Sequence, residues 1–125
     1  MTTVSLLVPT YNRADVIERI WKSWFALRGL TQLVLIDDGS TQDYTQLITT
    51  LRAAAAPKGI DVVYLKRDSR SGSPDAKNVG LGLCTGDYVL TTDDDITLAP
   101  DMAEKLIAAA HAQGPNAVIG ARVVY

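Results

Sequence analysis

The sequence predicts one α/β domain, spanning residues 1–125, built on a mainly parallel β-sheet with helices on both faces. Two observations lead to this prediction. Short apolar runs of strand length alternate with longer segments in which apolar residues recur at helical spacing. Segments that alternate in this way form right-handed crossovers, which place the strands parallel and stack helices on the sheet. The length of 125 residues suits a single domain with a single core.

The predicted strands are apolar runs too short to be helices. Val4 to Val8 is the first, and Pro9 stops it. Its apolar character, interrupted only by Ser5, favours a strand that is buried on both faces. Runs of the same kind predict further strands at residues 33–36, 61–65, 88–95 and 117–124.

The predicted helices lie between these strands. In the first, Ile17, Trp21 and Trp24 lie on one face, and Gly29 ends the helix. Apolar spacing and the flanking Pro and Gly residues predict four helices, at about residues 15–28, 42–55, 75–83 and 100–113.

Polar residues lie at or directly after the carboxyl end of each of the first four predicted strands. They occupy residues 10–12, 37–40, 67–70 and 93–95. Because the carboxyl ends of parallel strands share one edge, and ligands of such sheets bind there, we expect a binding site at this edge. A plainer interpretation of each cluster is local: Thr10 and Asn12 suit a helix cap, and Asp38-Gly39-Ser40 suits a turn.

Three consecutive carboxylates, Asp93 to Asp95, end the strand that begins at Tyr88. Like charges repel, so folding alone does not favour this run. In an extended segment Asp93 and Asp95 point to one side and Asp94 points away or into the loop. Two carboxylates form half a site for a divalent cation whose other oxygens come from substrate phosphates, which indicates a metal-diphosphate ligand. The alternative is a solvated acidic turn before a helix.

The overall charge limits the classes of partner. Twelve Lys and Arg residues against fourteen Asp and Glu give a net charge of −2, which disfavours nucleic-acid binding. Cys84 is the single cysteine and forms no internal disulfide, and since Met1 is followed by no basic start or long apolar run, we expect neither a signal peptide nor a membrane span. We expect a cytoplasmic protein, or one peripheral to the membrane.

Four motifs occur in order along the chain. They are Val8-Pro9-Thr10-Tyr11-Asn12, Ile36-Asp37-Asp38-Gly39-Ser40, the spaced Gly72, Ala76, Lys77, Asn78 and Gly80, and Gly86-Asp87-Tyr88-Val89 leading to Asp93-Asp94-Asp95. Together they resemble family 2 glycosyltransferases of the GT-A fold, whose sheet is Rossmann-like. The resemblance covers nearly the whole chain but only the nucleotide-binding half of that family's catalytic domain, which implies that residues 1–125 are truncated relative to it.

The resemblance implies the roles of individual residues. The implied nucleotide-sugar contacts are Thr10, Tyr11, Asn12, Asp38, Gly72, Lys77, Asp93 and Asp94. Within this set, residues 10–12 line the nucleoside pocket and Asp38 contacts the base. Asp95, together with Asp93, would hold the divalent cation, Mn²⁺ or Mg²⁺. Lys77 stands where the family usually has Arg, which keeps the charge but loses the bidentate fork.

The implied reaction is an inverting, metal-assisted transfer from a nucleoside-diphosphate-sugar to a saccharide, lipid or protein acceptor. The family's acceptor site and catalytic base lie in the half beyond Tyr125, so no catalytic residue is identified in this chain. One alternative is a non-catalytic nucleotide-sugar-binding half-domain that needs missing residues or a partner chain. The last predicted strand would lie at an edge of the truncated sheet, so self-association through it is also expected. A more remote alternative is a receiver-type signalling domain, but its acidic pair should follow the first strand.

Overall fold

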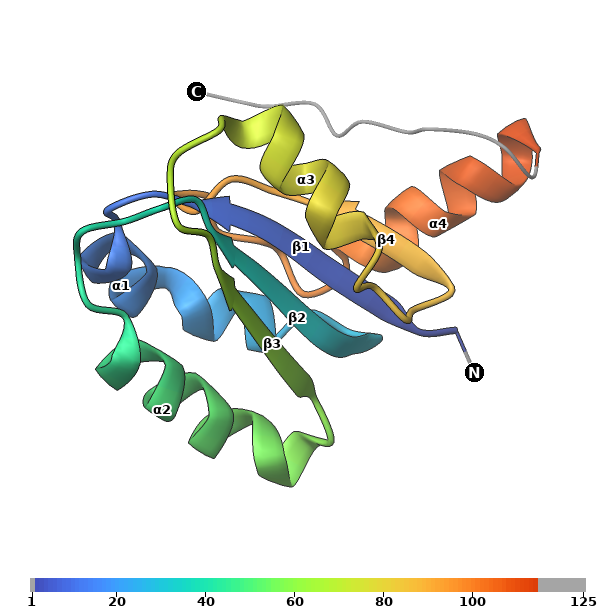
Figure 1. Ribbon diagram of the computed structural model, residues 1–125. Helices are drawn as coiled ribbons and strands as arrows, with labels where there is room; N and C mark the ends of the chain where they lie inside the picture. The colour runs from blue at the N-terminus through green and yellow to red at the C-terminus, as the bar shows by residue number, and fades with distance from the viewer. Residues whose placement is uncertain (1, 115–125) are drawn as a thin grey trace.

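Figure 1 shows the computed structural model of the chain, which describes residues 2–114. Its strands form a parallel sheet in the order β3-β2-β1-β4. Along the chain the elements are β1 (Val4–Thr10), α1 (Ala14–Phe25), β2 (Leu30–Asp37), α2 (Thr45–Ala55), the 3₁₀ helix η1 (Ala56–Lys58), β3 (Asp61–Lys66), α3 (Ser73–Leu81), β4 (Tyr88–Thr91) and α4 (Met102–Gln113). The predicted α/β class with a parallel sheet is therefore confirmed.

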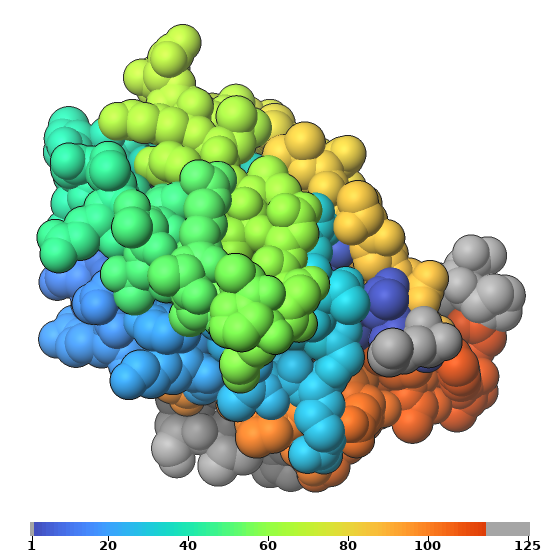
Figure 2. Space-filling view, turned by 90° about the horizontal axis from the view of Figure 1, so that it is seen from below, coloured from blue at the N-terminus to red at the C-terminus, as the bar shows by residue number. Residues whose placement is uncertain are grey.

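Helices cover both faces of the sheet, with α1 and α2 on one face and α3 on the other (Figure 1). Successive residues of β2 point to opposite faces, so Leu35 joins the larger core under α1 and α2 while Val34 joins the smaller core under α3. Trp24 of α1 and Leu51 of α2 are fully buried in the larger core. Figure 2 shows this face from outside, with α2 in green beside α1 in blue.

The helix α3 lies unusually close to the centre of the sheet. A Cβ atom added at Gly80 would lie 2.2 Å from Cδ1 of Leu7 on β1. The lack of a side chain at Gly80 therefore lets the end of α3 lie directly against Leu7 of β1 and Ile36 of β2. The amino end of α3 lies at the carboxyl edge of the sheet, where Ser73 lines a cavity.

The ends of several elements differ from the sequence predictions. β1 continues through Pro9 to Thr10 instead of ending before Pro9. The carbonyl of Leu7 accepts a hydrogen bond from the Thr92 amide, so the backbone of Leu7 faces β4. The backbone of Pro9, two residues later, faces the same side, but the pairing of β1 with β4 has ended before Pro9. The missing N–H of Pro9 therefore removes no bond from the sheet.

The strand that begins at Tyr88 ends at Thr91, and the three carboxylates lie in the turn that follows it. The helices α2 and α4 begin at Thr45 and Met102, two to three residues later than predicted, and α3 is shifted toward the amino terminus. Among residues 2–114 no helix combines the length and the apolar character needed to cross a bilayer. The predicted strand at 117–124, and the self-association expected of it, lie outside the described residues.

Candidate functional site

One cavity of about 440 Å³ opens at the carboxyl edge of the sheet. Six of the predicted site residues line it: Thr10, Tyr11, Asp38, Asp93, Asp94 and Asp95. Four further lining residues are Pro9, Arg13, Arg70 and Ser73. The lining therefore comes from four segments that are far apart in the sequence and follow, or lie at the end of, four different strands.

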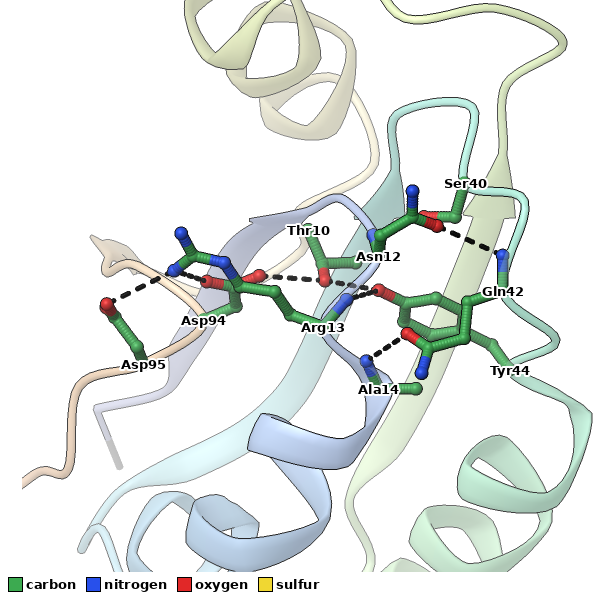
Figure 3. Close-up of polar contacts among 9 residues, drawn as sticks. All are labelled: Thr10, Asn12, Arg13, Ala14, Ser40, Gln42, Tyr44, Asp94 and Asp95. Carbon is green, nitrogen blue, oxygen red and sulfur yellow. Dashed lines mark hydrogen bonds and ion pairs between the residues drawn. The ribbon is translucent and has the colours of Figure 1, made fainter.

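Asn12 lies beside this cavity rather than in its lining. Its φ of 51° is in the left-handed region, which asparagine tolerates better than most residues. In this conformation Asn12 Oδ1 accepts a hydrogen bond from the amide of Gln42 at 3.0 Å, and the Asn12 amide donates one to Ser40 Oγ (Figure 3). Asn12 Oδ1 also accepts a hydrogen bond from the amide of Thr41 at 2.9 Å. Asn12 thus joins the loop after β1 to the loop after β2, and a direct contact with a nucleoside stays a prediction.

The adjacent carboxylates Asp37 and Asp38 have different surroundings. Asp37 is fully buried, and its carboxylate accepts hydrogen bonds from the Ser40 amide and the Tyr64 hydroxyl. Burial and this carboxylate raise the pKa of Tyr64, which keeps the hydroxyl protonated as a donor. Asp37 therefore closes the turn after β2, whereas Asp38 faces the cavity.

Asp38 holds the loop that follows β3. Its carboxylate accepts hydrogen bonds from the amide of Gly72 at 2.8 Å, and from the hydroxyl of Ser71 at 3.0 Å and its amide at 3.1 Å. Burial by itself raises the pKa of Asp38, but these donors and the Arg67 guanidinium together hold the pKa below its usual value. Asp38 is therefore ionised. The two loops pack so closely that a Cβ at Gly39 would lie 2.6 Å from the amide nitrogen of Arg70.

All three carboxylates of the acidic turn, Asp93 to Asp95, line the cavity. Asp94 is the buried carboxylate, at 6% exposure, and Asp93 and Asp95 are exposed. Of the two predicted orientations of Asp94, the one that points away from the site is wrong, because the strand ends at Thr91 and the turn directs the Asp94 side chain inward. Burial raises the pKa of Asp94, against the lowering effects of the Thr10 hydroxyl and the Arg13 charge.

A chain of buried hydrogen bonds orients Asp94. Thr10 Oγ1 lies 2.9 Å from Asp94 Oδ2 and 2.7 Å from the Tyr44 hydroxyl, which in turn lies 3.0 Å from the Arg13 amide nitrogen (Figure 3). A carboxylate only accepts, so Thr10 donates to Asp94 and accepts from Tyr44, and Tyr44 accepts from the Arg13 amide. Every donor and acceptor in this chain is then used consistently. Asp94 is consequently held in one orientation.

Arg13 joins two carboxylates of the acidic turn, Asp94 and Asp95. Its Nη1 lies 3.2 Å from Asp94 Oδ1 and 3.2 Å from Asp95 Oδ2 (Figure 3). The Asp94 side chain is 8% exposed and the Asp95 side chain 49% exposed. A cation is therefore accommodated between these carboxylates, and in this structure that cation is the guanidinium.

The cavity lining also carries an aromatic ring. The Arg70 guanidinium lies 4.2 Å from the centroid of the Tyr11 ring, within cation–π distance. Gly72 directs its amide to Asp38, and Lys77 is half-buried on α3, so neither belongs to the cavity lining. Their predicted contacts with the nucleotide are not tested by this geometry.

The sequence analysis did not single out Arg13, Arg70 or Tyr44. Arg13 and Arg70 carried a signal, since they lie in or beside the polar segments that follow β1 and β3. Tyr44 carried none, because it reaches Thr10 from a loop 34 positions away. The role of Tyr44 depends on how the first turn of α2 lies against the end of β1.

The donor set fits a divalent cation that shares its coordination with a ligand. Asp93 and Asp95 are exposed carboxylates of the cavity lining, and hard cations such as Mg²⁺ take one or two carboxylates together with substrate phosphates. Residues 2–114 contain no group of three or more His, Cys, Asp or Glu side chains placed to hold a metal. Diphosphate oxygens would complete the set of ligands.

Solved structures of glycosyltransferases have the same fold. The mannosyltransferase PcManGT from Pyrobaculum calidifontis, in complex with GDP-Man and Mn²⁺, is similar with a TM-score of 0.72 and 26% identity, over 85% of this chain and 31% of that one. TarS of S. aureus (residues 1–349), in complex with UDP-GlcNAc, is similar with a TM-score of 0.70 and 24% identity, over 85% of this chain and 31% of that one.

Sequence comparisons agree. The succinoglycan biosynthesis protein ExoO of Rhizobium meliloti is 30% identical over 93% of this chain and 32% of its own length. The undecaprenyl-phosphate 4-deoxy-4-formamido-L-arabinose transferase of Klebsiella pneumoniae is 31% identical over 86% of this chain and 33% of its own. The chain thus spans about a third of these relatives' length. The sequence profile described as Glycosyl transferase family 2 matches residues 5–125, and the chain belongs to that family.

Proposed function

We propose that the cavity binds the nucleoside diphosphate of a nucleotide-sugar, and that the chain is the donor-binding part of an inverting glycosyltransferase. The observation that carries this proposal is the convergence of Thr10, Tyr11, Asp38 and the acidic turn on one cavity at the carboxyl edge of the sheet. The similarity to a mannosyltransferase solved with GDP-Man and Mn²⁺ supports the same class of ligand.

The nucleoside would bind at the part of the cavity formed by Tyr11, Arg70 and Asp38. An aromatic face and a planar guanidinium both stack favourably on a base. Asp38 already accepts four hydrogen bonds from three donors of the neighbouring loop, two at each carboxylate oxygen. A carboxylate offers about four acceptor sites, so an N–H or O–H of the nucleoside would take the place of one of these bonds, such as the shared bond of the Ser71 amide. Asp38 would thus both shape the pocket and contact the nucleoside.

The diphosphate would bind beside Asp93 and Asp95, with a divalent cation held jointly by these carboxylates and the phosphate oxygens. When bound there, such a cation stabilises the negative charge that develops on the leaving diphosphate. Asp94, held by Thr10 and Arg13, keeps the acidic turn in position, and its contact with the nucleotide-sugar is part of the proposal. We propose Mn²⁺ or Mg²⁺ for this site.

A second candidate function is binding without transfer by this chain alone. Each carboxylate of the cavity lining already has a role in holding a loop, a metal or the donor, so we expect the base that deprotonates the acceptor to lie outside the described residues. A missing base forfeits roughly 10²–10⁴ in rate, and a missing acceptor wall forfeits positioning as well. The chain covers about a third of its relatives' length, which favours this candidate for residues 1–125 tested in isolation.

The acceptor is proposed from the relatives. One is named for undecaprenyl phosphate and another for succinoglycan biosynthesis, so we propose a lipid phosphate or a saccharide as acceptor. A lipid acceptor would bring the enzyme to the surface of a membrane, and a cytoplasmic location remains part of the proposal.

Calorimetric titration with UDP, GDP, CDP and ADP, each with and without Mn²⁺, tests this function. We expect at least one diphosphate to bind, and to bind more tightly when Mn²⁺ is present. The variant Asp95→Ala should lose the dependence on Mn²⁺, while Asp101→Ala, which removes a carboxylate outside the cavity, should behave as the parent does. Absence of binding for every diphosphate under both conditions would refute the proposal.

A further inference from the structure

Arg13 occupies the place between Asp94 and Asp95, beside the site proposed for the divalent cation. Its Nη1 lies 3.2 Å from an oxygen of each carboxylate, and the residue lines the cavity. We propose that Arg13 couples the binding of the metal to the binding of the diphosphate. In the free protein it neutralises Asp95, and in the complex it releases Asp95 to the metal and pairs with the diphosphate. This inference rests on the proposed function.

The two ion pairs of Arg13 differ in how easily they break. The Asp95 side chain is 49% exposed, and exposed ion pairs contribute little because water and salt screen them. The Asp94 side chain is 8% exposed and is held by Thr10. A ligand that competes for Asp95 therefore breaks the exposed pair first. Arg13 remains attached to Asp94 and stays at the cavity.

The guanidinium has donors to spare for a diphosphate. Both bonds that its side chain makes to the described residues use the one nitrogen Nη1. A guanidinium carries five N–H donors in a planar fork, and this fork matches phosphate oxygens in geometry. After Asp95 leaves, Arg13 can thus donate to a diphosphate without giving up Asp94.

The charges explain why metal and diphosphate should help each other to bind. A divalent cation bound alone at Asp95 would lie close to the Arg13 guanidinium, and the two positive charges would repel. A diphosphate contributes negative charge that both cations share, so it removes this repulsion. Arg13 consequently weakens binding of the metal alone and strengthens binding of the metal together with the diphosphate, which is a positive coupling between two ligands.

Arg70, the other arginine of the cavity lining, does not have this position. It lies over the Tyr11 ring, on the nucleoside part of the lining. Arg19 offers a control of equal charge for Arg13, because it is exposed on α1, the helix that begins directly after Arg13, and lies outside the cavity lining. Removing either arginine changes the net charge equally, so a difference between the two variants reports the position of the charge.

The experiment measures Mn²⁺ affinity in the 125-residue chain by electron paramagnetic resonance of free Mn²⁺, alone and with saturating UDP or GDP. Parent, Arg13→Gln and Arg19→Gln are compared. Typical coupling between two ligands changes affinity about 5–150-fold, and we expect the parent to lie in this range. Arg13→Gln should bind Mn²⁺ alone at least about 3-fold more tightly than the parent does. The ratio of its Mn²⁺ affinities with and without the diphosphate should be at least about 5-fold smaller than the parent's. Arg19→Gln should match the parent in both quantities.

The outcomes separate this inference from the proposed function. If the parent binds Mn²⁺ and a diphosphate but Arg13→Gln shows the same affinity and coupling, Arg13 forms only a structural ion pair and the inference is wrong. If the parent binds neither ligand, the proposed function is refuted and the inference falls with it. A measurement on the parent alone gives a second test: the Nε–H signal of Arg13, followed by NMR, should move when Mg²⁺ and UDP are added together. An unchanged signal at saturation would overturn the inference.

Discussion

Replacing Thr10 by valine tests the hydrogen-bonded chain that orients Asp94. Thr10 is 3% exposed, and its hydroxyl lies 2.9 Å from the Asp94 carboxylate and 2.7 Å from the Tyr44 hydroxyl. Thr10→Val keeps the branched shape of the side chain and removes both hydrogen bonds. Asp94 keeps its contact with Arg13, so its carboxylate loses one of its donors rather than all of them.

The expected loss of stability follows from these two bonds. A hydrogen bond to a charged group contributes about 1.5–3 kcal/mol, and one between neutral groups about 0.5–1.5 kcal/mol. We therefore expect Thr10→Val to lower the free energy of unfolding by about 2–4 kcal/mol. For a chain of this size each kcal/mol corresponds to about 3–4 °C, so the Tm should fall by roughly 6–16 °C.

Urea denaturation followed by circular dichroism measures this loss, and the slope of the transition should not change. Thr49→Val is the matched control: Thr49 is exposed on α2, and its hydroxyl bonds only to the preceding turn, so the variant should lie within about 0.5 kcal/mol of the parent. Tyr44→Phe removes the neutral bond from its other end, and the double variant should cost less than the sum of the two single variants. If Thr10→Val costs less than about 0.5 kcal/mol, or no more than Thr49→Val, the hydrogen-bonded chain does not hold Asp94.

Three further predictions concern ligand binding and pH. Asp95→Ala should abolish the Mn²⁺-dependent part of diphosphate binding, which calorimetry measures. It should change the free energy of unfolding by less than about 0.5 kcal/mol in urea denaturation, because the ion pair of Asp95 with Arg13 is exposed. Metal-dependent binding equal to the parent's would contradict this prediction. Asp38→Ala should weaken a nucleoside monophosphate and a diphosphate alike, by about 1–3 kcal/mol, whereas Asp95→Ala should act mainly on the diphosphate; equal effects of both variants on both ligands would count against this division. The pKa of Asp38 is lowered below 3.8 in the folded state, so its stabilising contribution is complete above that value and is lost as the pH falls through the folded pKa. Asp38→Asn should therefore lose less stability than the parent when the pH falls from 5 to 2, a range that extends about one to two units either side of the ordinary pKa of Asp. If the free energy of unfolding falls equally in both proteins, Asp38 does not carry this pH dependence.

The sequence by itself determined the class of fold and the edge of the sheet that carries the site. Apolar runs such as Val4 to Val8 and Leu33 to Ile36 can be satisfied only by burial on both faces, and the structure buries both completely. Because the four strands within residues 2–114 are parallel, the polar residues at their carboxyl ends had to meet at one edge. Six of the predicted site residues do line a single cavity there.

The sequence was less informative about the roles of neighbouring residues within each cluster. Alternation predicts side-chain directions only while the backbone is extended, and β4 ends two residues before Asp93. Beyond that point the direction of each carboxylate depends on its partners, and Asp94 turns inward because Thr10 and Arg13 bond to it. Asp37 and Asp38 diverge for the same reason, since one closes its own turn and the other holds the loop at Gly72.

Only the tertiary structure decided which partners these residues find. Tyr44 reaches Thr10 across 34 positions, and Arg13 reaches Asp94 across 81. Such contacts depend on how two loops lie against each other at the edge of the sheet, and no local pattern in the chain encodes that distance. The residues that a sequence places at a site can therefore be predicted from strand ends, while the buried bonds that fix their orientation depend on the packing of the loops around them.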